Sequence, residues 1–343
     1  MSAALCLAST TLLLATLAPS DPLATADRAT ANKAADKVTN DAAPTAPQPI
    51  ELVAIGEGRQ RDVTVRVHLP AATEPAPVVL FSHGLGGSRT GLEYLGRHLA
   101  ENGFVYVAMQ HSGSDASIWQ DVPRRDRMAA MKTAATAAEL RRRIADSTHT
   151  LDQLVEWSAD PTHPLFGRLD LDRIGMAGHS YGARTTQAMV GQGSRWEPSW
   201  KGDDRVRAAA IFSPSSPQRE DPAAAFASVD VPVLFMTGTD DGVMLGGIGK
   251  PVENRRQAYT AVPATTTKYQ VVFDGLEHSD FSGSRPGRNT PKPFHPPILT
   301  LVTAFFDAHL NGDADALATL HRDPKPFVLG KSDAWSRNAP VTD

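Results

Sequence analysis

The sequence predicts an α/β fold, with an eight-stranded, mostly parallel sheet and helices on both faces. Two leading segments alternate apolar and polar residues, as half-buried antiparallel strands do. Six continuous apolar runs follow, as in strands that are buried on both faces. Helical patterns separate these runs, and strands that alternate with helices form parallel sheets. The expected strands are residues 50–55, 63–69, 78–81, 104–109, 174–177, 206–212, 231–236 and 269–273, and the expected helices are 90–101, 129–158, 181–192, 252–260 and 298–310.

Composition narrows the class of protein. The 343 residues suffice for one large α/β domain or two smaller ones, with a sizeable buried core. The net charge of −4 does not favour a nucleic-acid partner. The single cysteine, Cys6, excludes a disulfide framework and a cysteine-based metal site in the folded body. We expect no metal, no organic cofactor and a monomer.

The N-terminus is predicted to be an export signal. Residues 3–18 are apolar but short and rich in Thr and Ser, so they do not suggest a stable membrane span. Ala-Thr-Ala at 24–26 offers a small-residue cleavage site, although no Lys or Arg precedes the apolar stretch. We therefore expect a signal peptide over 1–26, a flexible linker over 27–49, a single catalytic domain over 50–343, and a secreted or periplasmic protein. A disordered tail is the alternative for the first segment.

The most informative motif is Gly-His-Ser-Tyr-Gly at residues 178–182. By itself the pattern G-x-S-x-G occurs by chance in about one chain in ten of this length. Here a buried strand pattern precedes it at 171–177 and a helix-like segment follows at 181–190. A serine on such a strand-to-helix turn is lifted out of the sheet with its hydroxyl exposed. The two small glycines are expected to let the chain turn tightly without a Cβ clash.

Other reactive residues follow neighbouring strands. In an open parallel sheet, reactive groups gather at the carboxyl ends of the strands. A glycine-rich loop, residues 83–87, follows the strand at 78–81, two aspartates follow the strand at 231–236, and His278 follows the last strand. The chain order is therefore serine, acid, histidine.

This order suits nucleophilic catalysis by Ser180. His278 is the candidate base that takes the hydroxyl proton, and a carboxylate would hold the imidazole in the right tautomer. The acid is either Asp241 or Asp240, and a glycine three residues earlier favours Asp241.

Two backbone N–H groups are candidates for the oxyanion hole. The N–H of Tyr181 follows the serine, and the N–H of Leu85 lies in the glycine-rich loop. Donors of this kind stabilise the negative oxygen of a tetrahedral intermediate.

Three further histidines have structural interpretations. His83 is expected to support the glycine-rich loop, and His179 to pack under the serine turn. His111, at the end of the strand at 104–109, is expected to be a pocket or structural residue.

Two segments are too irregular for the core. Residues 112–128 contain Trp119, which either flanks the pocket or packs a loop against the body. Residues 282–297 follow His278, and their Gly and Pro content predicts a loop over the site that could act as a lid.

Residues 50–310 resemble the α/β-hydrolases, most of all the bacterial branch of predicted dienelactone hydrolases and platelet-activating-factor acetylhydrolase-like serine esterases. The resemblance implies the α/β-hydrolase fold and a serine–histidine–acid triad of Ser180, His278 and Asp241. The segments that carry it are FSHGLGGSRTGLEYLGRHLAENGF, MQHSGSD, RIGMAGHSYGA, MTGTDDG and FDGLEHSDF.

Two departures from these relatives are visible. Dienelactone hydrolases use a cysteine where this chain has Ser180. Platelet-activating-factor acetylhydrolases place the acid after the strand that follows the nucleophile helix, and here that strand ends in Phe-Ser-Pro at 212–214, with no carboxylate.

The sequence thus predicts a serine hydrolase that cleaves carboxylic esters through an acyl-enzyme, with lipid-like and polyester substrates left open. A serine peptidase of the same fold and a non-catalytic hydrolase-fold binding protein are the alternatives.

Overall fold

The computed structural model describes the folded body of the chain. Contacts divide the chain into Met1–Ala43 and Pro44–Asp343, and every described residue belongs to the second unit. The predicted signal peptide, most of the predicted linker and most of the predicted 282–297 loop lie outside the described residues. Among those described, no helix combines the length and apolarity needed to cross a bilayer. The described residues are 47–338 without 57, 59–60, 195–199, 243–249, 283–292, 323 and 325–326.

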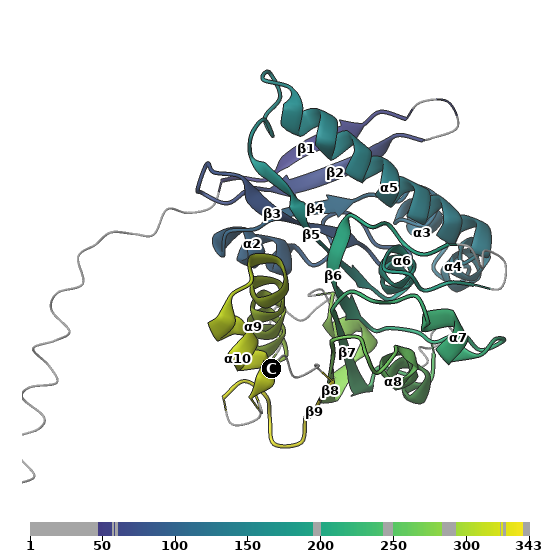
Figure 1. Cartoon of the computed structure of the whole chain (residues 1–343). Coiled ribbons are helices and arrows are strands. Elements are labelled where there is room, and N and C mark those ends of the chain that lie inside the picture. Colours follow the sequence, from purple (N-terminus) through teal and green to yellow (C-terminus); the bar gives the residue numbers. More distant parts are fainter. Residues whose placement is uncertain are drawn as a thin grey trace, which may run out of the picture. The chain divides into compact units, whose positions relative to one another are not determined.

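A nine-stranded sheet runs through this body in the order β1-β2-β4-β3-β5-β6-β7-β8-β9 (Figure 1). Strands β3 to β8 are parallel, β1 and β2 pair antiparallel at one edge, and β9 pairs antiparallel with β8 at the other. The predicted α/β fold class is confirmed. The strands are β1 (Ile50–Ala54), β2 (Val63–His68), β3 (Ala76–Ser82), β4 (Val105–Met109), β5 (Leu169–His179), β6 (Val206–Phe212), β7 (Val233–Asp240), β8 (Lys268–Glu277) and β9 (Ala334–Asn338).

Helices cover both faces of the sheet (Figure 1). Helices α2, α9 and α10 pack on one face, and α5, α6, α7 and α8 pack on the other. The helices are α2 (Glu93–Glu101), α3 (Ser117–Gln120), α4 (Arg127–Ala134), α5 (Ala137–Ala159), α6 (Tyr181–Met189), α7 (Pro222–Phe226), α8 (Val252–Ala261), α9 (His295–Phe306) and α10 (Ala314–His321), with a 3₁₀ turn η1 (His278–Asp280) and a π-helical turn η2 (Asp307–Asn311).

Several elements differ from the sequence prediction. Helices α3, α7 and α10 were not expected. The ninth strand, β9, was not expected, because the segment AWSRN is short and mostly polar and pairs only along the edge of β8. The expected helix over 129–158 is two helices, α4 and α5. Thr136 between them has an extended backbone, and its Oγ1 accepts the N–H of Glu139 at 3.1 Å as the N-cap of α5.

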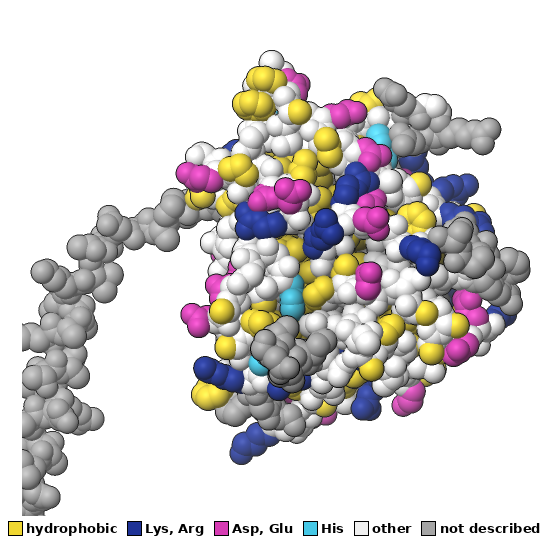
Figure 2. All heavy atoms as spheres, in the orientation of Figure 1, with side chains coloured by type: hydrophobic (Ala, Val, Ile, Leu, Met, Phe, Trp, Pro, Cys, Tyr) yellow, Lys and Arg dark blue, Asp and Glu magenta, His cyan; other side chains and the backbone are white. Residues whose placement is uncertain are grey.

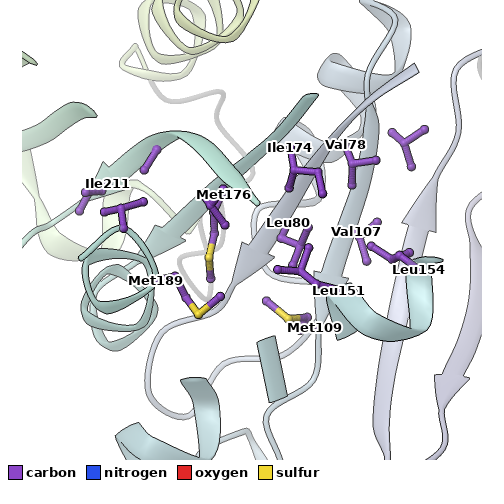
Figure 3. Close-up of a cluster of buried hydrophobic side chains, with 14 of the residues drawn as sticks. Val78, Leu80, Val107, Met109, Leu151, Leu154, Ile174, Met176, Met189 and Ile211 are labelled. Atoms are coloured by element: carbon purple, nitrogen blue, oxygen red, sulfur yellow. The ribbon is translucent and has the colours of Figure 1, made fainter. Parts of the chain in front are cut away.

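The central strands are held by a cluster of buried apolar side chains between the sheet and helices α5 and α6. Figure 3 shows Leu151 and Leu154 of α5 against the side chains of β3 and β4, with Met189 of α6 against β5 and β6. All three side chains are buried. Close packing of this kind makes the carboxyl ends of the central strands a rigid platform.

Charges of both signs are mixed on the face that Figure 2 shows. One surface network joins the first two strands to the loop after β3: Arg66 pairs with Glu51 at 2.7 Å and with Glu93 at 3.1 Å, and Arg89 pairs with Glu51 at 2.6 Å. Exposed pairs of this kind contribute at most about 1 kcal/mol each. The face that Figure 2 shows therefore has no large patch of charged side chains of one sign.

The cap of α5 gives a first prediction. We expect Thr136→Ala to lower the free energy of unfolding by about 1 kcal/mol, because the substitution leaves the N–H of Glu139 without its acceptor. Urea unfolding measures the change. Thr133→Ala, in the exposed part of α4, is the control and should cost less. An equal effect of the two substitutions would contradict the capping role.

Candidate active site

Ser180 lies on the turn between β5 and α6 with φ 59° and ψ −110°. A positive φ at a residue with a side chain costs about 1–3 kcal/mol and persists only where the surroundings impose it. Here the N–H of Ser180 donates to the carbonyl of Phe212 at 2.9 Å, which ties the turn to the end of β6. The side chain is half-buried and lines a pocket of about 420 Å³. The hydroxyl therefore faces space that a ligand can enter.

The glycines on either side of Ser180 are required by close packing rather than by a positive φ. A Cβ on Gly182 would lie 1.8 Å from the carbonyl oxygen of Ser82, and one on Gly178 would lie 2.4 Å from the carbonyl oxygen of Gly182. The positive φ falls on the serine itself. The expectation that the small glycines let the chain turn tightly without a Cβ clash agrees with these distances.

Ser180, His278 and Asp241 form a continuous hydrogen-bonded chain. His278 Nε2 lies 2.8 Å from Ser180 Oγ, and His278 Nδ1 lies 2.7 Å from Asp241 Oδ1. The histidine begins the turn η1 after β8, and the aspartate follows β7. Asp241 is fully buried.

Asp240 is not part of this chain. Its side chain is exposed, and the contact found for its carboxylate is Thr239 Oγ1 at 3.5 Å. Of the two alternatives for the acid, the structure brings only Asp241 to the imidazole.

Two hydroxyl groups hold the other carboxylate oxygen of Asp241. Ser213 Oγ donates to Oδ2 at 2.7 Å, and Thr237 Oγ1 donates to it at 2.8 Å. Ser213 follows β6 and, like Ser180, has a positive φ, of 53°. The carboxylate is therefore fixed in orientation, with Oδ1 toward the imidazole.

Arg255 of α8 is a residue of this site that the sequence reasoning missed. Its Nε lies 3.0 Å from Asp241 Oδ1, its Nη1 donates to the carbonyl of Ser213 at 3.0 Å, and its Nη2 is 3.1 Å from His278 Nδ1. The side chain is almost fully buried, and burial lowers the pKa of the guanidinium while Asp241 opposes that shift. Arg255 lies on the buried face of α8, together with Asn254 and Ala258. The helical spacing of this face is the signal that could have pointed to Arg255 rather than to its neighbour Arg256.

The two candidate oxyanion donors line the same pocket as Ser180. The N–H of Tyr181 is the first in α6, and an α-helix has no internal acceptor for its first N–H groups. In the loop, Gly86 N–H donates to Ser114 O at 2.8 Å and Gly87 N–H to Gly84 O at 3.0 Å. No acceptor is found for the N–H of Leu85 among the described residues. The role of the Tyr181 and Leu85 N–H groups as an oxyanion hole stays a prediction.

Trp119 anchors the glycine-rich loop. Its Nε1 donates to the carbonyl of Gly86 at 2.8 Å, and a Cβ on Gly86, which has φ +71°, would lie 2.7 Å from that nitrogen. The side chain is not among the pocket residues. The interpretation as loop packing thus fits better than the one as a pocket wall.

A second Ser–His–Asp chain lies buried beneath the loop. Ser82 Oγ is 2.9 Å from His111 Nε2, and His111 Nδ1 is 2.8 Å from Asp146 Oδ2. Burial, with the charge of Arg143, lowers the pKa of His111 to about 4, so the ring is neutral. Ser82 and His111 have no exposed surface, so no substrate reaches them. The chain is structural.

Arg143 and His83 connect this chain to the glycine-rich loop. Arg143 Nη1 donates to the carbonyl of His83 at 2.7 Å, and its Nε donates to Ser114 Oγ at 2.8 Å. The N–H of His111 donates to His83 Nε2 at 3.1 Å, so His83 Nδ1 carries the proton and donates to Gly84 O at 2.7 Å. Burial holds the pKa of His83 well below its usual value. The His83 ring therefore contacts the glycine-rich loop that it was expected to support.

His179 packs beneath the serine turn. Its ring centroid lies 4.8 Å from that of His278 and 5.6 Å from that of Phe281. Burial, together with His278 and Arg255, holds its pKa well below the usual value. The ring is therefore a neutral wall behind the catalytic candidate.

Metal ligands do not gather in this site: among the described residues, no group of three or more His, Cys, Asp or Glu is placed to hold a metal ion.

This fold, with a serine on the strand-to-helix turn after the fifth strand, is that of the α/β-hydrolases. Residues 53–153 match the family described as platelet-activating factor acetylhydrolase, isoform II. A platelet-activating factor acetylhydrolase from Cavia porcellus is 26% identical over 148 residues, which cover 36% of this chain and 34% of the relative. The match thus spans about a third of the curated relative. The resemblance to this esterase branch is confirmed.

The range of the family match limits what it says about the site. Residues 53–153 hold the glycine-rich loop and the buried Ser82 chain, but not Ser180, Asp241 or His278. The catalytic roles expected of those three residues therefore rest on their geometry alone.

Arg255 gives a second prediction. We expect Arg255→Gln to lower the free energy of unfolding by about 3 kcal/mol, because it leaves a buried carboxylate without its cationic partner. Arg256→Gln is the matched control on the exposed face of α8, and its effect should stay within about 0.5 kcal/mol. Urea unfolding of both variants compares them. Equal stabilities would show that Arg255 does not support Asp241.

The neutral buried histidines give a third prediction. The unfolded chain takes up a proton on His111 near pH 6.5, whereas the folded protein does so only near pH 4. Stability should therefore fall as the pH drops through this window, by up to about 1.4 kcal/mol per pH unit from this residue alone. Urea unfolding at pH 7, 6 and 5 measures the slope.

His309, which lies away from the candidate active site, allows a test of the neutral state of the buried histidines. Burial lowers its pKa to about 4 as well, so His309→Gln should give a shallower slope over the same pH range. A slope that is flat in the wild type, or unchanged in the variant, would contradict the neutral state of these rings.

Proposed function

We propose that this protein is a serine hydrolase that cleaves carboxylic esters through an acyl-enzyme intermediate. The observation that carries the proposal is the chain of short hydrogen bonds from Ser180 through His278 to a fully buried Asp241. Similarity to a platelet-activating factor acetylhydrolase supports ester substrates in particular.

The first half-reaction forms the acyl-enzyme. Ser180 Oγ attacks the ester carbonyl carbon while its proton passes to His278 Nε2. Asp241 stabilises the resulting imidazolium through Nδ1, and the N–H groups of Leu85 and Tyr181 stabilise the carbonyl oxygen as it becomes negative. The tetrahedral intermediate collapses, His278 returns the proton to the leaving alkoxide oxygen, and an alcohol departs.

The second half-reaction releases the acid. A water molecule gives its proton to His278 Nε2 and attacks the acyl carbon, and the intermediate then expels Ser180 Oγ, which recovers the proton. No step requires a metal or an organic cofactor.

The pocket beside Ser180 has room for the acyl group of an ester. The apolar side chains that line its 420 Å³ include Phe81, Leu92 and Met131. Lipid-like and polyester esters remain candidates.

We also propose that the protein is exported. The apolar stretch at 3–18 and the Ala-Thr-Ala at 24–26 support a cleaved signal peptide. N-terminal sequencing of protein recovered from culture medium or periplasm tests this, and an uncleaved start on protein that stays in the cytoplasm would refute it.

The fourth prediction tests the triad. We expect Ser180→Ala to abolish labelling by a fluorophosphonate probe and to lower kcat for p-nitrophenyl acetate and butyrate by at least ~10⁴-fold. Asp241→Asn should lower kcat by about 10⁴-fold, because the amide cannot orient and charge-stabilise the imidazole.

Asp240→Asn is the matched control, because it makes the same change one residue away on an exposed side chain. Its kcat should stay within about twofold of the wild type. Equal losses in the two asparagine variants would refute the assignment of the acid. Folded wild-type protein that is neither labelled nor active would favour a binding protein, and cleavage of peptide amides but not esters would favour a peptidase.

A further inference from the structure

A second pocket adjoins the one at Ser180. It has a volume of about 580 Å³ and lies between α5, α6 and the segment after β6. The two pockets share Ala135, Arg184, Ser215 and Lys250 in their linings. A ligand that reaches Ser180 can therefore extend into the second pocket past Arg184 and Lys250.

Three cations line this second pocket: Arg184 of α6, Arg219 and Lys250. Among the described residues, no carboxylate forms an ion pair with any of the three. Lys250 Nζ donates to Gln218 Oε1 at 2.6 Å, and the guanidinium carbon of Arg184 lies 5.8 Å from the centre of the Tyr181 ring.

Two further charged residues, Arg141 and Glu220, also line the second pocket, and each already has a partner. They contribute one charge of each sign, so the excess of positive charge comes from the other three.

The other two cations act on Lys250. Burial lowers the pKa of Lys250, and the nearby charges of Arg184, Arg255 and Arg219 lower it further. Arg184 and Arg219 are exposed and Lys250 is half-buried. Like charges that line one pocket repel one another, and a bound anion relieves that repulsion. Arginine side chains are also well suited to carboxylate and phosphate groups, which they bind with paired hydrogen bonds.

We propose that the second pocket is an anion subsite, and that the preferred substrates are esters that carry a carboxylate or phosphate group on the part remote from the scissile bond. The inference rests on the proposed ester hydrolysis, and it names the substrate class of that same site. Arg184 and Lys250 stand at the junction of the two pockets, so an anionic group beside them leaves the ester carbonyl free to reach Ser180.

The fifth prediction compares matched esters of similar length. Mono-(4-nitrophenyl) glutarate carries a carboxylate at the end of its acyl chain, and 4-nitrophenyl valerate does not. We expect kcat/KM to be at least about tenfold higher for the anionic ester, as a charge-assisted hydrogen bond predicts. The ratio of the two kcat/KM values should fall about tenfold in Arg184→Gln and in Lys250→Gln, and with added NaCl.

A second pair of esters places the anion on the alcohol side instead. 4-Acetoxybenzoate and 4-acetoxybenzamide differ in charge but share the acetyl group. A preference in this pair alone would assign the subsite to the leaving group, and a preference in the glutarate pair alone would assign it to the acyl chain.

Arg207→Gln is the matched control, because Arg207 is exposed near the amino end of β6, opposite to the edge that carries Ser180. Its ratio should equal that of the wild type. Equal ratios in wild type, Arg184→Gln and Lys250→Gln would overturn the anion subsite while leaving ester hydrolysis intact.

Binding separates the subsite from the catalysis. Calorimetry should show that Ser180→Ala binds mono-(4-nitrophenyl) glutarate more tightly than 4-nitrophenyl valerate, and that adding Arg184→Gln removes the difference. If the wild type hydrolyses neither ester but this difference is found, the subsite stands and the proposed function fails. If no difference is found in binding or in turnover, the subsite is refuted.

Discussion

The site depends on the close approach of helix α6 to the end of strand β3. A side chain at Gly182 would overlap the carbonyl oxygen of Ser82, at 1.8 Å, so the two backbones are in direct contact. The same approach brings the glycine-rich loop to the serine turn, where a Cβ on Gly84 would lie 3.5 Å from Ser180 Cβ. The candidate nucleophile and the candidate oxyanion donor of the loop are thus placed by one backbone contact, which no side-chain movement can relax.

Two Ser–His–Asp chains in one protein show that hydrogen-bond geometry alone does not define a catalytic site. The chain of Ser82, His111 and Asp146 repeats the distances of the chain at Ser180 within a few tenths of an ångström. What differs is access: Ser82 is fully buried, whereas Ser180 lines a pocket. The buried chain instead fixes the strand end from which the loop departs, and its neutral histidine makes that support sensitive to acid.

Much of this arrangement could be predicted from the sequence, because its signals are local. Continuous apolar runs mark strands buried on both faces, and the carboxyl ends of those strands then bring distant residues such as Ser180 and His278 to one edge. The choice of Asp241 over Asp240 was favoured only by a glycine three residues earlier and by the family resemblance, and the role of Arg255 was missed. Each depends on the direction in which a side chain leaves a loop or a helix. Asp240 and Asp241, like Arg255 and Arg256, are adjacent residues of the same type, so the sequence around them gives the same local signal.

The spacing of parallel strands explains how the candidate acid, Asp241, can follow β7 rather than β6. Neighbouring strands lie about 4.8 Å apart, so a side chain that leaves the end of either β6 or β7 can reach the same imidazole. The contact between Ser213 Oγ and Asp241 Oδ2, 2.7 Å long, shows that residues from both strand ends meet at one point. Here a serine follows β6, the carboxylate that reaches the imidazole follows β7, and Ser213 orients that carboxylate through its hydroxyl. Arg255 spans both ends, since it contacts Asp241 and the carbonyl of Ser213, and it thereby fixes the register of the two loops on which the acid depends.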